Sequence, residues 1–270
     1  MAPSMFEQVY VIRVPIGETA VTVAYCLLEK KDQATYEEML QILLDECEQR
    51  SIFPEPEVIM ADFEKAIHNA VGVLFDNQVQ MKGCFFHLTQ SVWRKVQQLG
   101  LAKQYREDEE FRLFVGMIFG LAFLPVAYVK EGLTYICSVA PDDALELLGY
   151  FDATYVNGGY KSVRAPNGIM RLKRINPLYS LELWNVNHAT LTGSARTNNI
   201  CESWNCKYFN MVGHRHPSIW RTINAFQMDN ASVSALIALD NVGQCQDFDN
   251  GQKRVPQFLR GISHNMRLLC

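Results

Sequence analysis

Asp62 is the first residue whose type and position could carry chemistry. It ends the apolar run EVIMAD (57–62), and apolar residues at helical spacing follow it, so the carboxylate lies at a strand-to-helix junction. Open α/β sheets often place functional side chains beyond the carboxyl ends of their strands, where a carboxylate can bind a divalent cation. The structural alternative is that Asp62 caps the following helix, which is a common role for aspartate there.

Cys84 and His87 form a second pattern, C-x-x-H, where an apolar run gives way to a helix pattern. Such a pair could supply two zinc ligands, contribute to an active site or belong to a buried core. Structural zinc needs two further ligands, and the spacing of the nearest candidates, Cys201 and Cys206, suits neither a knuckle nor one helix face. We therefore do not expect zinc. A core pair at the end of a strand is the preferred interpretation.

The composition indicates a globular intracellular protein. The chain has 270 residues, of which 49% are hydrophobic, and a formal net charge of −4, so any DNA contact must come from a local basic patch. Its eight cysteines are spread along the sequence without a secretory signal, which favours reduced thiols. The uncharged stretch 113–129 contains glycine and proline and is shorter than about 20 residues. It predicts a buried helix, and we expect no membrane span.

Residues 8–100 follow an α/β pattern that would position these side chains. Alternating and β-branched residues predict strands at 8–16, 20–28, 57–62 and 79–87. Helical spacing predicts helices at 36–47, 63–74 and 88–99, the first of them opened by a capping box at Thr35 and Glu38. The predicted order is therefore β-β-α-β-α-β-α.

Helix patterns replace the strand patterns after residue 100, and a basic segment follows them. Between Asp152 and Glu182 the sequence has no acidic residue, and it contains five cations: Lys161, Arg164, Arg171, Lys173 and Arg174. We predict a loop here that either contacts DNA phosphates or is simply solvated. Another helix is expected in RTNNICESWNCKYFNMV, where Glu202 could be an ordinary acid of the first turn.

Five motifs of the sequence, in this order, resemble the transposase domain of Mutator-like elements (MULE) over about residues 2–230. They are VIMADFEKAI, KGCFFHLTQSVWRKVQQLGL, YREDEEFR, PLYSLELWNV and RTNNICESWN. The resemblance implies a ribonuclease-H-like core with a mixed sheet. It also implies that two Asp and one Glu bind Mg²⁺ or Mn²⁺ and catalyse DNA cleavage and strand transfer. By motif, the resemblance implies that Asp62 and Glu202 are two of these catalytic, metal-binding carboxylates. Cys84 and His87 match the family's C-x-x-H beside the site. The functional alternative to a core role for this pair is to orient DNA or the carboxylates.

The first Asp of that family lies in a D-G-T-F-like motif shortly before a stretch like APSMF, whereas this sequence begins MAPSMF. The resemblance therefore predicts an N-terminally truncated core without its first, central strand and with an incomplete site. The predicted sheet either keeps a gap between the strands at 8–16 and 57–62 or closes by sliding the hairpin across. Either arrangement predicts a marginally stable protein with a loosely held hairpin.

Four regions are expected: a core at 5–100, a helical insertion with the basic loop at 101–195, a returning core helix with Glu202 at 196–230, and a helical tail at 231–270. The predicted function is that of a MULE-type transposase catalytic domain impaired by the missing Asp. A domesticated, non-catalytic DNA-binding or assembly protein is the alternative, and an unrelated nuclease using Asp62 with acids such as Asp76 is a weaker one. DNA is the expected partner, without a small-molecule substrate, and the family implies the nucleus. Homo-oligomers are left open, and so is residual enzyme activity.

Overall fold

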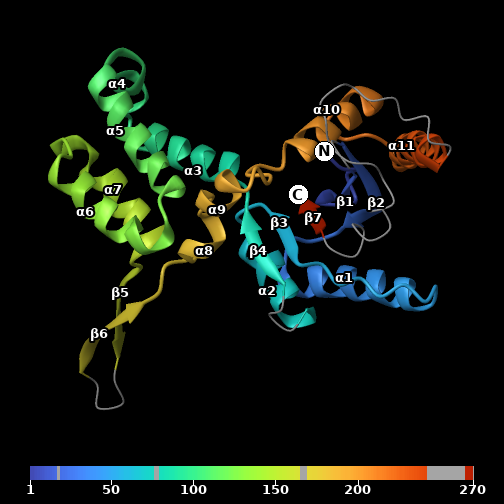
Figure 1. Ribbon diagram of the computed structural model, residues 1–270, viewed down its shortest axis with the longest axis horizontal. Coiled ribbons are helices and arrows are strands. Elements are labelled where there is room, and N and C mark those ends of the chain that lie inside the picture. Colours follow the sequence, from blue (N-terminus) through green and yellow to red (C-terminus); the bar gives the residue numbers. More distant parts are fainter. Residues whose placement is uncertain (17–18, 76–78, 165–168, 242–264, 270) are drawn as a thin grey trace. The chain divides into compact units, whose positions relative to one another are not determined.

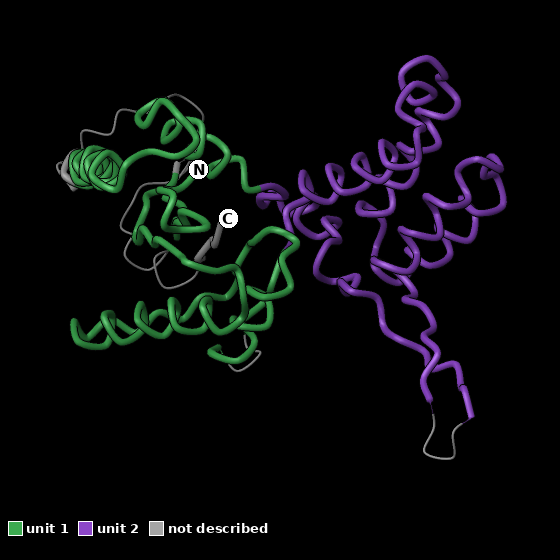
Figure 2. The backbone as a smooth tube through the Cα atoms, turned by 180° about the vertical axis from the view of Figure 1, so that it is seen from behind, with its two compact units in different colours: residues 1–82, 198–270 green, residues 83–197 purple. Residues whose placement is uncertain are grey.

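The chain divides into two compact units. A computed structural model describes residues 1–270 except 17–18, 76–78, 165–168, 242–264 and 270. The first unit contains residues 1–82 and 198–270, and the second contains residues 83–197 (Figure 2). The second unit begins shortly before the helix that we predicted at 88–99 and assigned to the core, so this helix groups with the second unit.

The two N-terminal strands form the predicted hairpin. β1 (Gln8–Ile16) and β2 (Thr19–Leu28) pair antiparallel, with Gln8 opposite Leu28 at one end and Ile16 opposite Thr19 at the other. Val, Ile and Tyr dominate β1, as expected for a strand that packs on both faces. A bulge between Ile12 and Arg13 shifts the register by one residue.

The hairpin belongs to a five-stranded sheet whose order is β2-β1-β7-β3-β4 (Figure 1). β3 (Val58–Ala61) and β4 (Gln80–Gly83) form the far side of this sheet, and β7 (Asn265–Leu269) lies in the middle. β7 runs antiparallel to β1 and parallel to β3. The structure therefore differs from both arrangements that we predicted, because β7 supplies partners to the facing backbone edges of β1 and β3.

Helices pack on both faces of the sheet in the first unit. α1 (Gln33–Glu48) and α2 (Lys65–Leu74) cover one face, and α10 (Asn199–Val212) and α11 (Ile219–Asn241) belong to the other. Tyr10 and Ile12 are buried with α1 and α2, whereas Val11 is buried against α10. This alternation follows from the two-residue period of a strand. The cap of α1 is Asp32, which accepts from the Thr35 amide, and not Thr35 as predicted.

The second unit is mostly helical. Its helices are α3 (Phe85–Gln98), α4 (Ala102–Glu107), α5 (Glu109–Gly120), α6 (Val129–Ser138), α7 (Leu145–Phe151), α8 (Leu181–Trp184) and α9 (Asn187–Leu191). Short 3-10 turns cover Leu121–Phe123, Val126–Tyr128 and Asp142–Ala144, and a π-turn covers Asp152–Val156. Its core includes Phe111 and Trp184, whose indole donates to the Tyr155 carbonyl at 2.8 Å.

Three predicted segments differ in detail. The strand expected at 79–87 ends at Gly83, because the apolar residues after Cys84 open α3 and do not extend the strand. The basic segment is no loop, since β5 (Gly159–Arg164) and β6 (Met170–Ile175) pair antiparallel. The expected helical tail contains the end of α11 and strand β7, while its residues 242–264 and 270 lie outside the described part. Within the described residues, no helix is both long and apolar enough to traverse a membrane.

Candidate functional site

Asp62 directly follows β3, and its surroundings are polar. The side chain is half-buried, and its Oδ1 accepts a hydrogen bond of 3.0 Å from the Asn198 amide. The N-cap of α2 is Glu64, whose amide donates to the Asp62 carbonyl at 2.8 Å. Asp62 therefore lies at the predicted strand-to-helix junction but is not the residue that caps the helix.

Asn198 connects Asp62 with the helix that carries Glu202. Asn198 is the N-cap of α10, and its carbonyl accepts from the amides of Cys201 and Glu202. Asparagine is a favoured N-cap because its side chain can accept from the first turn. Here no such side-chain bond forms, and the buried amide donates to Asp62 instead. The half-buried Glu202 is thus within one helical turn of the residue that contacts Asp62.

His68 on α2 holds the backbone of Asp62 from the other side. Its Nε2 lies 2.7 Å from the Asp62 carbonyl oxygen and is the donor, because a carbonyl can only accept. Burial lowers the pKa of His68 below its ordinary value, and the bond to Asp62 offsets part of this effect. The neutral imidazole therefore fixes the main chain at the end of β3.

The N-terminal end of α10 is tied to the sheet by Arg13 of β1. The guanidinium donates to the carbonyls of Ile200 and Ala20. Desolvation by burial is the main influence on this group and lowers the pKa of Arg13. A half-buried arginine bound to two carbonyls fixes the turn that precedes Glu202, and the sequence pattern of β1 gave no indication of this role.

A buried carboxylate on α11 holds α10 from its other side. Asp229 is 3% exposed and accepts four hydrogen bonds, from Thr22 (3.1 Å) and Tyr25 (2.7 Å) on β2 and from Trp204 (2.8 Å) and Lys207 (2.7 Å) on α10. Burial raises the pKa of Asp229, but the bonds from Lys207, Tyr25 and Trp204 outweigh it, so the pKa is below its usual value. The charge of Asp229 therefore joins α11, α10 and β2.

Cys84 and His87 belong to the second unit, at the start of α3. Cys84 is fully buried and is the N-cap residue, and His87 lies in the first turn with its ring 5.4 Å from that of Phe86. Cys84 directly follows β4, which is next to β3 in the sheet. Cys84 therefore lies at the end of a strand, whereas His87 belongs to the helix.

The side chains available to a metal differ from the ion site that the family implies. Across the described ranges, no group of three or more His, Cys, Asp or Glu side chains is arranged to hold a metal ion. β7 takes the central position of the sheet with the sequence NMRLL, which contains no carboxylate. Cys201 is buried and Cys206 is exposed, as expected for residues about 140° apart around one helix. The described side chains do not fit a three-carboxylate site.

The remaining predicted residues lie on the second unit or outside the described part. Lys161 and Arg164 are on β5, Arg171, Lys173 and Arg174 are on β6, and all five are exposed. Asp76 lies outside the described residues.

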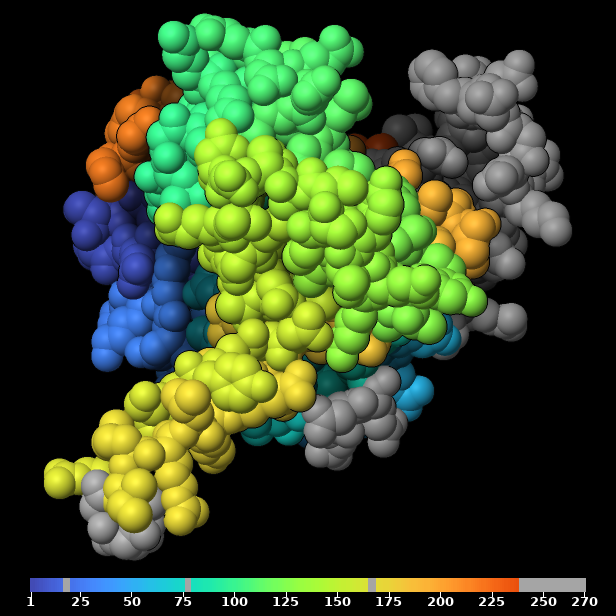
Figure 3. Space-filling view, turned by 90° about the vertical axis from the view of Figure 1, so that its left-hand side faces the viewer, coloured from blue at the N-terminus to red at the C-terminus, as the bar shows by residue number. Residues whose placement is uncertain are grey.

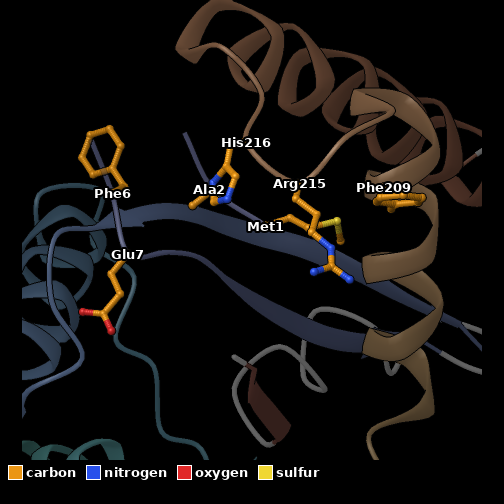
Figure 4. A pocket seen from close by; sticks show the side chains of 7 residues that line it. All are labelled: Met1, Ala2, Phe6, Glu7, Phe209, Arg215 and His216. Atoms are coloured by element: carbon orange, nitrogen blue, oxygen red, sulfur yellow. The ribbon is translucent and has the colours of Figure 1, made fainter. Parts of the chain in front are cut away.

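A surface pocket of about 420 Å³ in the first unit contains none of the predicted residues (Figure 4). Its lining is Met1, Ala2, Phe6, Glu7, Phe209, Arg215 and His216. Figure 4 shows the Glu7 carboxylate and the Arg215 guanidinium well apart, without a shared focus for a ligand.

Comparison with known proteins adds one finding. Residues 6–91 match the family model of the MULE transposase domain, a stretch that includes β1 to β4, Asp62 and the C-x-x-H pair. No curated protein and no solved structure matches the chain.

Proposed function

Since residues 6–91 match the family model of the MULE transposase domain, we propose that this chain acts on DNA as a transposase-type protein and that Asp62 and Glu202 occupy the position of the family's cleavage site. The observation that carries the proposal is the bond from Asn198 to Asp62, because Asn198 also opens the helix of Glu202. A transposase domain acts on DNA in general. The Asn198 side chain donates to Asp62, and the Asn198 carbonyl accepts from the backbone amide of Glu202.

The sheet order supports a ribonuclease-H-like core. Such cores have the order 3-2-1-4-5, with the first strand antiparallel to the second and parallel to the fourth. β7 runs antiparallel to β1 and parallel to β3, and β2 and β4 occupy the outer positions. We propose that β7 takes the position of the first strand.

The same position is where the family's first Asp would be found. β7 provides no carboxylate there, so the proposed site has two of the three acids. We propose that the chain on its own binds DNA but does not cleave it, as expected of an impaired catalytic domain or a domesticated DNA-binding protein. Its place of action would be the nucleus, where its substrate lies.

The test measures binding and cleavage in parallel. Purified chain is incubated with a labelled DNA duplex and with supercoiled plasmid in Mg²⁺ or Mn²⁺, beside the variant Asp62→Asn. We expect salt-sensitive binding by both proteins and no metal-dependent nicking by either. Absence of binding at low salt would contradict the action on DNA. Nicking that disappears in Asp62→Asn would show a complete site and overturn the incomplete one.

A further inference from the structure

The exposed hairpin β5–β6 concentrates positive charge on one face. We call these two strands the basic ribbon, and Figure 1 shows them extending from the helices of their own unit. In the antiparallel register Lys161 lies opposite Lys173, and Arg171 lies opposite Val163. Opposed residues point to the same side, so these three cations share one face, named the lysine face.

The other face of the ribbon is mixed. Tyr160 is paired with Arg174, Ser162 with Leu172, and Arg164 with Met170. Tyr160 is 69% exposed and Leu172 is 73% exposed. We call this face the arginine face. Its two arginines, Arg164 and Arg174, lie at opposite ends of the ribbon, with apolar side chains between them.

Among the described residues, no carboxylate is paired with the cations of the lysine face. No acidic residue occurs between Asp152 and Glu182, and in the described part of the chain none of the five cations of the ribbon forms an ion pair with a carboxylate. Like charges directly opposite each other destabilise a strand pair, and a lone two-stranded hairpin is only marginally stable in water. A bound polyanion would relieve this repulsion.

The base of the ribbon is anchored. Gly158, with φ of 76°, precedes β5, and its amide donates to the Asp152 carbonyl at 3.2 Å. The Tyr179 amide, shortly after β6, donates to the Thr154 carbonyl at 3.1 Å, and the rings of Tyr155 and Tyr179 stack. Both strands are therefore fixed to the π-turn at Asp152–Val156, and Figure 3 shows the yellow-green and yellow atoms of the ribbon beyond the helices of the same unit.

We propose that the lysine face of the ribbon binds the phosphate backbone of duplex DNA. This inference rests on the proposed action on DNA and names the surface that contacts it. Six residues per strand give a ribbon about 20 Å long. Duplex DNA offers one negative charge per about 1.7 Å of its axis. The three clustered cations then face several phosphates at once, and binding is independent of base sequence.

The test compares two variants with equal change in charge. Lys161→Ala/Lys173→Ala removes two cations from the lysine face, and Arg164→Ala/Arg174→Ala removes two from the arginine face. Binding of the full chain to one DNA duplex is measured over a series of salt concentrations. The slope of log K against log salt should decrease by about 1.8 in the lysine variant and clearly less in the arginine variant. Thermal melting serves as the folding control, and the lysine variant should melt no lower than the unchanged chain.

Each outcome has one meaning. Equal decreases in the two variants, or an unchanged slope in the lysine variant, would overturn the assignment of the lysine face while DNA binding itself remains. Failure of the unchanged chain to bind DNA would contradict the proposed function. Stronger binding of an RNA duplex of equal length would overturn DNA as the partner of this face.

Discussion

At the scale of single residues, a buried network holds the helix that carries Glu202. Asp229 accepts from two residues of β2 and two of α10, and only Lys207 among these donors carries a positive charge. A buried carboxylate is tolerated when its lone pairs are satisfied and a cation lies close. Removing the carboxylate would leave several donors without their acceptor.

Replacing this carboxylate should be costly. We expect Asp229→Ala to lower the free energy of unfolding by about 2 to 4 kcal/mol, because it leaves three neutral donors without their acceptor, two of them on the buried side chains of Thr22 and Trp204. Asp45→Ala is the matched control, since Asp45 is exposed and its side chain accepts from that of Gln41 one helical turn away. Its effect should be about 0.5 kcal/mol or less. Urea unfolding measures both, and equal effects would contradict the role of the network.

The same residue gives a pH dependence with a defined sign. The pKa of Asp229 is lowered from 3.8 in the folded protein, so its contribution to stability is fully present above that value. It is lost as the pH falls through the lower, folded-state pKa. The stability difference between the unchanged chain and Asp229→Asn should therefore be constant near neutral pH and should shrink below pH 3.8. A difference that grows in acid would contradict the lowered pKa.

At the scale of elements, the root of the basic ribbon depends on one glycine. A Cβ atom on Gly158 would lie 2.1 Å from the Ile175 carbonyl oxygen and 2.6 Å from the Asn176 carbonyl carbon, both of which are backbone atoms. Its φ of 76° is also rarely adopted by other residues. No side chain can be added there unless β6 moves.

Substitution of this glycine should separate the strands at their base. We expect Gly158→Ala to destabilise the second unit by at least about 1 to 3 kcal/mol and to expose the ribbon to protease. Gly149→Ala is the control, because Gly149 lies in α7 and a methyl group added to it would meet no atom within 4 Å. That change should be neutral or stabilise by up to about 1 kcal/mol. Similar protease sensitivity in the two variants would contradict the close contact.

The elements predicted correctly are those with local signals. The hairpin β1–β2, the helix after Asp62 and the helix that ends before Gly100 have sequence periods and turn residues that define them. The basic ribbon was predicted as a loop because cations conceal its short alternation. Asn198 was not singled out, because its contact with Asp62 joins residues 136 positions apart. Local patterns contain no information on such pairs.

At the scale of the whole molecule, the position of β7 accounts for the continuity of the sheet. Ile12 lies opposite Leu268, and Ile59 lies opposite Met266. Without β7, the sheet would consist of β1–β2 and β3–β4 with two unpaired edges between them. The sequence did not predict this strand, because its partners are more than 200 positions away and five residues carry little periodic signal.

Deleting residues 265–269 should open the sheet. We expect a lower melting temperature and faster hydrogen exchange at Val11–Arg13, the part of β1 that pairs with β7. The antiparallel pairing of Gln8–Tyr10 with β2 provides an internal reference, since β7 is not opposite these residues. Unchanged exchange at Val11–Arg13 would contradict the central place of β7.

The place of β7 also bears on how the chain reaches its folded state. Closing the contact between Ile12 and Leu268 requires the ordering of a loop of about 255 residues, whose entropic cost must be met before the contact contributes any stability. Folding rates fall as such long-range contacts become more numerous. During synthesis, the first four strands leave the ribosome well before β7. Until β7 pairs with them, β1 and β3 each have an unpaired backbone edge. We expect the nascent protein to need protection from aggregation until β7 is made.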